Sequence, residues 1–385
     1  MIRIPFNRPT ITGREREYVQ QVLESSHWSG DGAFTKRCAS FLETMLDAPR
    51  VLLTTSCTHA LEMAALLLGI GAGDEVIVPS FTFVSTVNAI ILRGARPVFV
   101  DIRPDTLNMD ERAVEAAVTD QTRAIWVVHY AGVACEMNAI AEIAGRRRIP
   151  IVEDAAHALF GRYHGKALGT WSSLAALSFH ETKNVSSGEG GALVLNDPAL
   201  IERAEILREK GTNRSSFFRG QVDKYTWVDV GSSYLPSELN AAVLFAQLEV
   251  WNIIQSKRHA VWNRYFTELA GWAAANGVRL PIVPAGCEHP AHLFYLLLPS
   301  ERDRAALIKH LAARGILSVF HYVPLHAAPM GQRLGYRAED LPITVDVSER
   351  LLRLPLYAGM SDEDVDEVVA AILQWQPSTH PAISA

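Results

Sequence analysis

The sequence is poor in cysteine, and its few cysteines form no recognisable metal-binding pattern. They stand at positions 38, 57, 135 and 287, with no C-x-x-C pair and no cysteine and histidine set at zinc spacing. This usage fits a protein of a reducing compartment. We therefore expect a cytoplasmic protein without a metal centre.

Long apolar runs and an excess of basic charge are also missing. No apolar run approaches the roughly 20 residues that cross a membrane, and the N-terminal stretch MIRIPFNRPTITG has no apolar signal core. The net charge is −6, whereas nucleic-acid binding needs a basic face. The basic run at 145–150 is better suited to ending a helix, where cations are favourable. We expect a protein that binds neither membrane nor nucleic acid.

What the sequence does contain, from about residue 50, is an alternation of short apolar runs with amphipathic helical patterns. Strands are expected at 51–56, 75–80, 97–101, 123–130 and 149–156, and helices at 58–69, 83–94, 110–118 and 137–148. Further strands are expected at 175–179 and 191–196. Continuous apolar strands between helices predict an α/β fold with a buried, mostly parallel sheet.

The pattern changes in the last third of the chain. Residues 236–270 predict one long helix or two bent ones, and strands at 292–299 and 317–322 then alternate with helices at 302–315 and 361–375. Ser361 and Asp364 have the spacing of a capping box. The sequence thus predicts a large domain, residues 1–249, a small α+β domain, 250–375, and a disordered tail, 376–385.

Residues with possible chemistry follow the predicted strands, at the sheet edge where α/β proteins bind ligands. Lys183 lies in the small, polar loop SFHETKNVSSGEGG between two strands. Such a buried amine has a lowered pKa and attacks carbonyls; the alternative is an ordinary solvated lysine. Ser56 and Thr58 open a helix, where they could bind phosphate or simply cap it.

Glu153 and Asp154 end another strand, where an unpaired carboxylate is costly to bury. A cationic ligand atom such as a protonated pyridine nitrogen would offset that cost, and helix capping or a salt bridge is the alternative. An acid, a lysine and an anion site on one sheet edge are what pyridoxal phosphate requires. Ser178 could add a hydroxyl for the phosphate. Phe83, with Phe81 as its rival, could stack on the ring.

The blocks PSFTFVST, VEDAAH, SFHETKN, GEGG and YVPLH resemble the DegT/StrS family of sugar-nucleotide aminotransferases, and the likeness runs from IPFNRP to RLLRLPLY. Longer blocks, GDGAFTKRC, VHYAGVACEM, REKGTNRSSFFRGQVDKYTW and VGSSYL, resemble a subgroup that acts at C4 of a dTDP-4-keto-6-deoxyhexose. The resemblance implies pyridoxal-phosphate fold type I, like aspartate aminotransferase, and a homodimer with its active site between the chains. It also implies L-glutamate and a dTDP-keto sugar as substrates.

The resemblance also implies roles for individual residues. Lys183, Asp154 and His157 would be catalytic, with His129 less directly involved and Glu189 shaping the lysine loop. The cofactor would contact Ser56, Cys57, Thr58, Phe83, Asp154, His157, Ser178, Lys183 and Ser233. The sugar nucleotide would contact Arg219, His321, Tyr322 and His326.

Two features bear on that assignment. Many members carry Asn-Tyr-Arg before the long helix and use the asparagine to reach the neighbouring chain's cofactor, whereas this chain has Ser-Ser-Tyr-Leu at 232–235. Relatives that act as dehydratases have histidine in place of Lys183. A nicotinamide-dependent dehydrogenase is disfavoured, because no G-x-G-x-x-G follows the first strand. A regulatory protein that keeps the fold, and aminotransferases that form a C3 or a gluco-configured C4 product, remain as alternatives.

Overall fold

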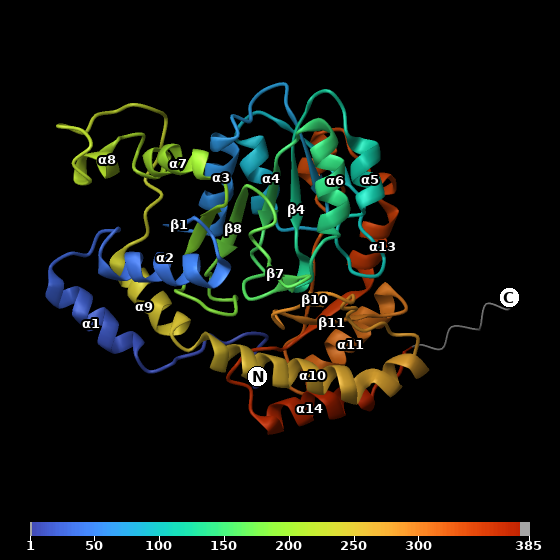
Figure 1. The fold of residues 1–385 in the computed structure, drawn as a ribbon. Helices are drawn as coiled ribbons and strands as arrows, with labels where there is room; N and C mark the ends of the chain where they lie inside the picture. The colour runs from blue at the N-terminus through green and yellow to red at the C-terminus, as the bar shows by residue number, and fades with distance from the viewer. Residues whose placement is uncertain (1, 378–385) are drawn as a thin grey trace.

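A seven-stranded sheet forms the centre of the computed structural model, which describes residues 2–377 (Figure 1). The strands run in the order β1-β9-β8-β5-β4-β2-β3. All run the same way except β9, which pairs antiparallel with β1 and β8. The strands are β1 (Arg50–Thr54), β2 (Glu75–Pro79), β3 (Arg96–Val100), β4 (Thr122–Val128), β5 (Ile151–Asp154), β8 (Leu174–Ser178) and β9 (Gly191–Leu195). The predicted mostly parallel α/β sheet is confirmed.

Helices cover both faces of this sheet, which explains the continuous apolar strands. In β4, Ala124 and Trp126 pack into one hydrophobic cluster, while Ile125 and Val127 pack into the other. The first cluster lies under α3 (Cys57–Leu67), α4 (Val84–Ile91) and α7 (Ile201–Arg208). The second lies under α1 (Glu15–Ser25), α2 (Ala33–Leu46), α5 (Glu111–Ala117), α6 (Met137–Arg147) and α9 (Glu238–Leu248).

The C-terminal third builds a second, antiparallel sheet of three strands in the order β11-β13-β12. The strands are β11 (Phe294–Leu297), β12 (Val319–Phe320) and β13 (Leu351–Leu354). A separate hydrophobic cluster joins this sheet to α10 (Trp251–Ala275), α11 (Glu301–Ala313) and α14 (Asp362–Leu373), and α10 lies beside α14 (Figure 1). The domain limits predicted at 249 and 375 stay a prediction, and residues 378–385 of the predicted tail lie outside the described residues.

Of the two alternatives for 236–270, one long helix or two bent ones, the second is confirmed, because Glu249 and Val250 separate α9 from α10. The Ser361–Asp364 capping box is also confirmed. Other elements differ from the sequence prediction. The strand expected at 317–322 is only two residues long. Elements not predicted are α1, α2, α7, α8 (Arg214–Phe218), α12 (Pro329–Arg333), α13 (Pro342–Arg350), β13 and a small sheet of β6 (Arg162–Tyr163), β7 (Lys166–Ala167) and β10 (Cys287–Glu288).

A further apolar cluster joins the C-terminal sheet to the loops that follow the central strands. Phe81 and Tyr130, from the loops after β2 and β4, pack with Leu293, Tyr295 and Leu351. This contact brings β12 and β13 up to the carboxyl edge of the central sheet. Among residues 2–377, no helix combines the length and hydrophobicity needed to span a bilayer.

Candidate active site

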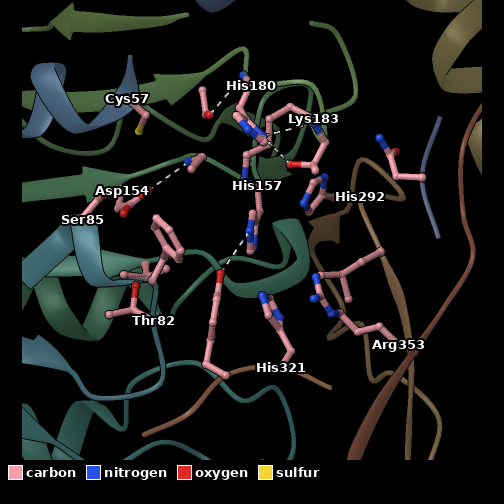
Figure 2. A pocket seen from close by; sticks show the side chains of 18 of the residues that line it. Cys57, Thr82, Ser85, Asp154, His157, His180, Lys183, His292, His321 and Arg353 are labelled. Atoms are coloured by element: carbon pink, nitrogen blue, oxygen red, sulfur yellow. Dashed lines mark hydrogen bonds between the residues drawn. The ribbon is translucent and has the colours of Figure 1, made fainter. Parts of the chain in front are cut away.

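A cavity of about 740 Å³ lies where the carboxyl edge of the central sheet meets the C-terminal sheet (Figure 2). Segments after β1, β2, β5 and β8 form one wall, and residues 319–323 and 353–356 contribute to the other. The site residues predicted from sequence that line it are Ser56, Cys57, Thr58, Phe83, Asp154, His157, Ser178, Lys183, His321 and Tyr322.

Lys183 lies in a compact loop between the antiparallel neighbours β8 and β9. The loop is held by backbone bonds from Lys183 N–H to the His180 carbonyl, 2.9 Å, and from Ser187 N–H to the Phe179 carbonyl, 3.0 Å. Burial lowers the pKa of Lys183 to about 8, against the opposing effects of Cys57 and Asp154. Roughly a tenth of this amine is then neutral at pH 7, so a nucleophilic fraction is always available.

Asp154 ends β5 and presents a buried carboxylate to the cavity. Its Oδ2 accepts a hydrogen bond from the Thr86 hydroxyl, 2.7 Å, and its Oδ1 accepts one from the Ala156 amide, 3.1 Å. Burial raises its pKa despite these bonds and the positive charge of Lys183. No side chain among residues 2–377 forms an ion pair with it, so a cationic ligand group would stabilise its charged form.

Glu153, the neighbouring acid, is bonded within the protein and has a structural role. It points to the other side of β5 and accepts five hydrogen bonds, from His129, Gly169, Trp171 and twice from Ser172. Burial alone would raise its pKa, but these bonds outweigh burial and lower it. His129 is fully used in this network, with its Nδ1 accepting from the Cys135 amide, and lies outside the cavity lining.

The start of α3 contributes Ser56, Cys57 and Thr58, the predicted phosphate-binding residues, to the wall. Ser56 is the N-cap, and its hydroxyl accepts a hydrogen bond from the His59 amide, 3.1 Å. The first amides of a helix have no intrahelical acceptor, so those of Cys57 and Thr58 are available to a phosphate. Gly191 lies directly beneath them, since a Cβ there would be 2.3 Å from the Cys57 nitrogen. Ser56 therefore caps α3 and also lines the cavity, and its binding of a phosphate stays a prediction.

The two candidate aromatic residues after β2 occupy different environments. Phe83 lines the cavity and is 57% exposed. Phe81 is 1% exposed and packs against Tyr130 with ring centroids 5.0 Å apart. Phe83 is therefore the candidate for stacking on a bound ring.

His157, His292 and His321 line the cavity near one another (Figure 2). The rings of His157 and His292 stack with centroids 4.3 Å apart, and the Tyr322 hydroxyl lies 3.4 Å from His157 Nε2. Burial holds the pKa values of His157, His292 and His321 well below their usual range. The Nδ1 of His157 is buried without a partner in the described structure, so it is available to a bound group.

The tautomer of His292 follows from its partners. The Pro290 carbonyl can only accept, and it receives hydrogen bonds from the side-chain amides of Asn184 and Gln255. Asn184 Oδ1 must then face His292 Nδ1, 2.9 Å away, so Nδ1 carries the proton. His292 is thereby a neutral imidazole that links the residue after Lys183 to the C-terminal part of the chain.

Three predicted site residues lie outside this cavity. The structure corrects the prediction that His326 contacts the sugar nucleotide. His326 is buried, with Nδ1 2.6 Å from the Ser80 hydroxyl and Nε2 3.3 Å from the Ala338 carbonyl, and it holds two loops together. Arg219 and Ser233 line a different hollow of about 900 Å³. Arg219 forms an ion pair there with Glu205, 2.7 Å.

Sequence reasoning missed several residues that line or support the cavity. Ser85, His180, His292 and Arg353 contribute to the lining, and Thr86 bonds to Asp154. Ser85 and Thr86 lie within the quoted block PSFTFVST and could have been read as polar residues of a helix start. The other three stand in coil or on short strands, where spacing gives no signal.

The groups on the central-sheet wall are complementary to those of pyridoxal phosphate. A buried acid without a cation suits a protonated ring nitrogen, a lysine amine suits an aldehyde, and the amides at the start of α3 suit a phosphate. The unpartnered His157 Nδ1 suits a ring oxygen. No group of three or more potential ligands within residues 2–377 is arranged to hold a metal ion.

Comparisons with known proteins agree with this fit. The family model of DegT/DnrJ/EryC1/StrS aminotransferases matches residues 9–373. The spore coat polysaccharide biosynthesis protein SpsC of Bacillus subtilis is 34% identical over 377 residues, covering 96% of both chains. Spr1654 of Streptococcus pneumoniae, solved in pyridoxal phosphate, pyridoxamine phosphate and apo forms, has 29% identity, with TM-scores from 0.88 to 0.89 over 96% of this chain and 96–98% of its own. DesV of S. venezuelae, solved with a ketimine intermediate, has 32% identity and a TM-score of 0.88 over 97% of this chain and 99% of its own.

Proposed function

Because the chain belongs to the DegT/DnrJ/EryC1/StrS aminotransferase family, we propose that it moves the amino group of L-glutamate to a dTDP-4-keto-6-deoxyhexose. The acceptor is the C4 keto group, and the products are dTDP-4-amino-4,6-dideoxy-D-galactose and 2-oxoglutarate. The resemblance of the longer sequence blocks to dTDP-4-amino-4,6-dideoxygalactose transaminases, also called dTDP-4-oxo-6-deoxyglucose aminotransferases, supports this choice of substrate.

The observation that carries the proposal is the pairing, in one cavity, of an amine whose pKa is lowered to about 8 with a buried, cation-free carboxylate. The enzyme is a pyridoxal-phosphate-dependent transferase like its family. When bound, pyridoxal phosphate supplies an aldehyde that carries the amino group and a ring that accepts electrons from the substrate carbon.

The residues on the central-sheet wall hold this group in place. Asp154 would accept a hydrogen bond from the ring nitrogen and keep that nitrogen protonated. The amides and hydroxyls of Ser56, Cys57, Thr58 and Ser178 would bind the phosphate. Phe83 would pack on the ring, and His157, held neutral by burial, would donate from Nδ1 to the ring oxygen.

Lys183 moves the proton in both half-reactions. Its neutral amine would take the proton from the α-carbon of glutamate and hold it for the transfer that the bound cofactor makes possible. In the second half, the same amine returns a proton to C4 of the hexose. A pKa near 8 suits this exchange, because both protonation states are populated near neutral pH.

His321 and Tyr322 are the proposed contacts of the sugar nucleotide on the C-terminal wall. Arg219 and Ser233 line the separate hollow and not the active-site cavity of their own chain. They could contact a substrate or cofactor only in the active site of a second copy of the chain. We therefore propose a homodimer in which each copy contributes Arg219 and Ser233 to the other's active site. Phe218 and Trp227, which are 69% and 78% exposed, lie on the same segment and offer apolar surface for it.

The competing proposals are a C3 aminotransferase, a gluco-configured C4 product and a regulatory protein without turnover. Purified enzyme is to be incubated with L-glutamate and a panel of dTDP-keto sugars, and the product analysed by NMR. We expect bleaching of the yellow cofactor band by glutamate and a galacto-configured amine at C4. An amine at C3 or of gluco configuration would replace the proposal by its rivals, and a band that glutamate leaves unchanged would support the regulator.

A further inference from the structure

A turn behind the active-site cavity has a strained backbone. Residues 290–292 precede β11 and end at His292, whose ring lines the cavity. Ala291 has a positive φ of 48°, which lies in the left-handed region that a residue with a Cβ rarely adopts. Such a conformation persists only where the surrounding contacts impose it, and it occurs most often at functional sites. The contacts of this turn therefore need a functional explanation.

Two side chains of α10 bind the carbonyls of the turn. Gln255 donates from Nε2 to the Pro290 carbonyl, 3.0 Å. Arg258 donates from Nε to the Ala291 carbonyl, 3.1 Å, and from Nη2 to the His292 carbonyl, 2.5 Å. Three successive carbonyls are thereby held from one helix, and these bonds account for the positive φ between them.

Arg258 is costly to keep in this position. It is 2% exposed, and no aspartate or glutamate within residues 2–377 forms an ion pair with it. Burial lowers its pKa to about 9. A buried cation without a carboxylate lowers stability, and an apolar residue of similar size often serves the fold as well. The turn that Arg258 holds must therefore matter for more than folding.

The ring of His292 is fixed as firmly as its backbone. Its Nδ1 donates to Asn184 Oδ1, 2.9 Å, and its ring stacks on that of His157 at an interplanar angle of 27° (Figure 2). A small cavity between His292, Asn184 and Lys183 measures only about 10 Å³, so the ring has little room to turn. The plane of the His157 ring consequently depends on that of His292.

The turn also supports the backbone of His157. Pro290 packs so closely on Gly132 that a Cβ at position 132 would lie 2.3 Å from Pro290 Cδ and 2.6 Å from the His157 carbonyl oxygen. The two ends of the turn therefore hold the His157 segment at two points, the backbone through Gly132 and the ring through His292.

We propose that Gln255 and Arg258, which we call the α10 clamp, are positioning residues for the reaction. They act through His292, whose ring sets the plane of His157. The inference rests on the proposed function and deepens it, because His157 is the proposed donor to the ring oxygen of the cofactor. Neither residue of the clamp is among the described residues that line the cavity. Loss of the clamp should therefore slow the reaction without weakening substrate binding.

The test is a double-mutant cycle of Arg258→Gln and His292→Asn in the holoenzyme. The second substitution keeps a hydrogen-bond donor but removes the ring that stacks on His157. Stopped-flow absorbance gives the rate constant and the apparent Kd for glutamate, and dialysis gives the Kd of the cofactor. Pyridoxal phosphate is achiral, so its visible circular dichroism reports how firmly the protein orients its ring. The last two measurements need no substrate.

Each single substitution should lower the saturating rate constant on the order of 10-fold, as for a misplaced reacting group. The Kd for glutamate should stay within about twofold, and the visible circular dichroism should decrease. Because both substitutions act on one ring, the double variant should be within about twofold of the slower single variant. Arg258→Lys keeps the charge and can donate to one carbonyl, so it should regain part of the loss.

Tyr265→Phe is the matched control. It removes a buried hydrogen bond from the same helix, to the Pro355 carbonyl at 3.0 Å, but does not touch the turn. It should lower the melting temperature and leave the rate constant unchanged. An equal loss of rate in this variant would attribute the effect to a general loosening of α10 and would overturn the proposal.

Three further outcomes would also overturn it: an unchanged rate constant in either single variant, a change confined to the Kd for glutamate, or losses that multiply to about 100-fold in the double variant. If Arg258→Gln fails to fold, Gln255→Met takes its place in the cycle with the same expected result. Failure of the proposed function looks different. The wild type would then aminate no dTDP-4-keto sugar, while the Kd and the circular dichroism of the cofactor would still follow the cycle.

Discussion

The two walls of the active-site cavity are built in different ways. The wall that carries Asp154, Ser178 and Lys183 is formed by the ends of central strands of four to seven residues, buried between two layers of helices. The wall that carries Tyr322 and Arg353 is formed by strands of two and four residues and the coil around them. We expect the first wall to position the reacting groups and the second to select the substrate. Changes in the first should affect the rate of chemistry, and changes in the second should affect substrate affinity.

Replacing the amine on the first wall should have the largest effect. Lys183→Ala removes both the group that binds the cofactor covalently and the group that moves the proton, so turnover should be lost. Borohydride reduction followed by peptide mass mapping should label residue 183 in the wild type and nothing in the variant. Normal turnover by Lys183→Ala would contradict the assignment of this wall.

The adjacent acids of β5 offer the next contrast. Asp154→Asn should slow the glutamate half-reaction by roughly 10²- to 10⁴-fold, because the ring nitrogen loses the carboxylate that keeps it protonated. Stopped-flow absorbance measures this rate. A variant that reacts at the wild-type rate would remove Asp154 from the mechanism.

Glu153→Gln is the matched comparison for that experiment. It replaces a carboxylate oxygen by an NH2 group, which cannot accept from the five N–H and O–H donors that surround Glu153. The free energy of unfolding should therefore fall by about 3 kcal/mol. The rate of the folded fraction should stay close to that of the wild type. Denaturant titration measures the loss, and a large catalytic defect without loss of stability would contradict the structural role.

Acid should destabilise the C-terminal side more than the central sheet. Burial lowers the pKa of His289 to about 4, and those of His292 and His321 are also lowered. Between pH 6.5 and 4 the unfolded chain takes up these protons first, so each histidine costs up to about 1.4 kcal/mol per pH unit as the pH falls. On the central-sheet side, the lowered pKa of His157 acts in the same direction, and the raised pKa of Asp154 acts in the opposite one.

The melting temperature should therefore drop between pH 7 and 5, and His289→Gln should make that dependence shallower. Scanning calorimetry across this pH range measures both. A melting temperature that is independent of pH in the wild type would show that these imidazoles are accessible to protons in the folded state.

The smallest effect is expected on the second wall. Tyr322→Phe removes a cavity-lining hydroxyl that is proposed to bind the sugar nucleotide, and a single neutral hydrogen bond contributes about 1 kcal/mol. The KM for the sugar nucleotide should rise about fivefold while the glutamate half-reaction is unchanged. Initial-rate kinetics with each substrate varied separately distinguish the two, and a defect confined to glutamate would assign Tyr322 to the donor instead.

The same contrast explains what could be predicted from the sequence. The strands that end at Asp154 and Ser178 are continuous apolar runs between helices, and such runs specify both a strand and the edge at which it ends. Placing Lys183 beside them required only the topology of a parallel sheet. The central-sheet wall was thus largely predictable from periodicity.

The C-terminal wall could not be predicted from the sequence, and the reasons are physical. β13 is a four-residue strand that ends at a proline, and nothing in LLRL reveals that Arg353 faces a cavity while its neighbours are buried. His326 shares a short motif with Tyr322, yet it turns toward Ser80 because a loop after β2, distant in sequence, supplies its partner. Side-chain direction in coil depends on such distant partners, which spacing cannot reveal.

Gly191 has a consequence beyond its own position. It leaves no room for even a methyl group beneath the first amides of α3, and it also closes the base of the loop that carries Lys183 through its pairing with Ser178. The separation between the Lys183 loop and the first amides of α3 is therefore set by the missing side chain. Gly191→Ala would leave every proposed catalytic group in the chain. It would change the distance between the Lys183 amine and a cofactor bound at α3.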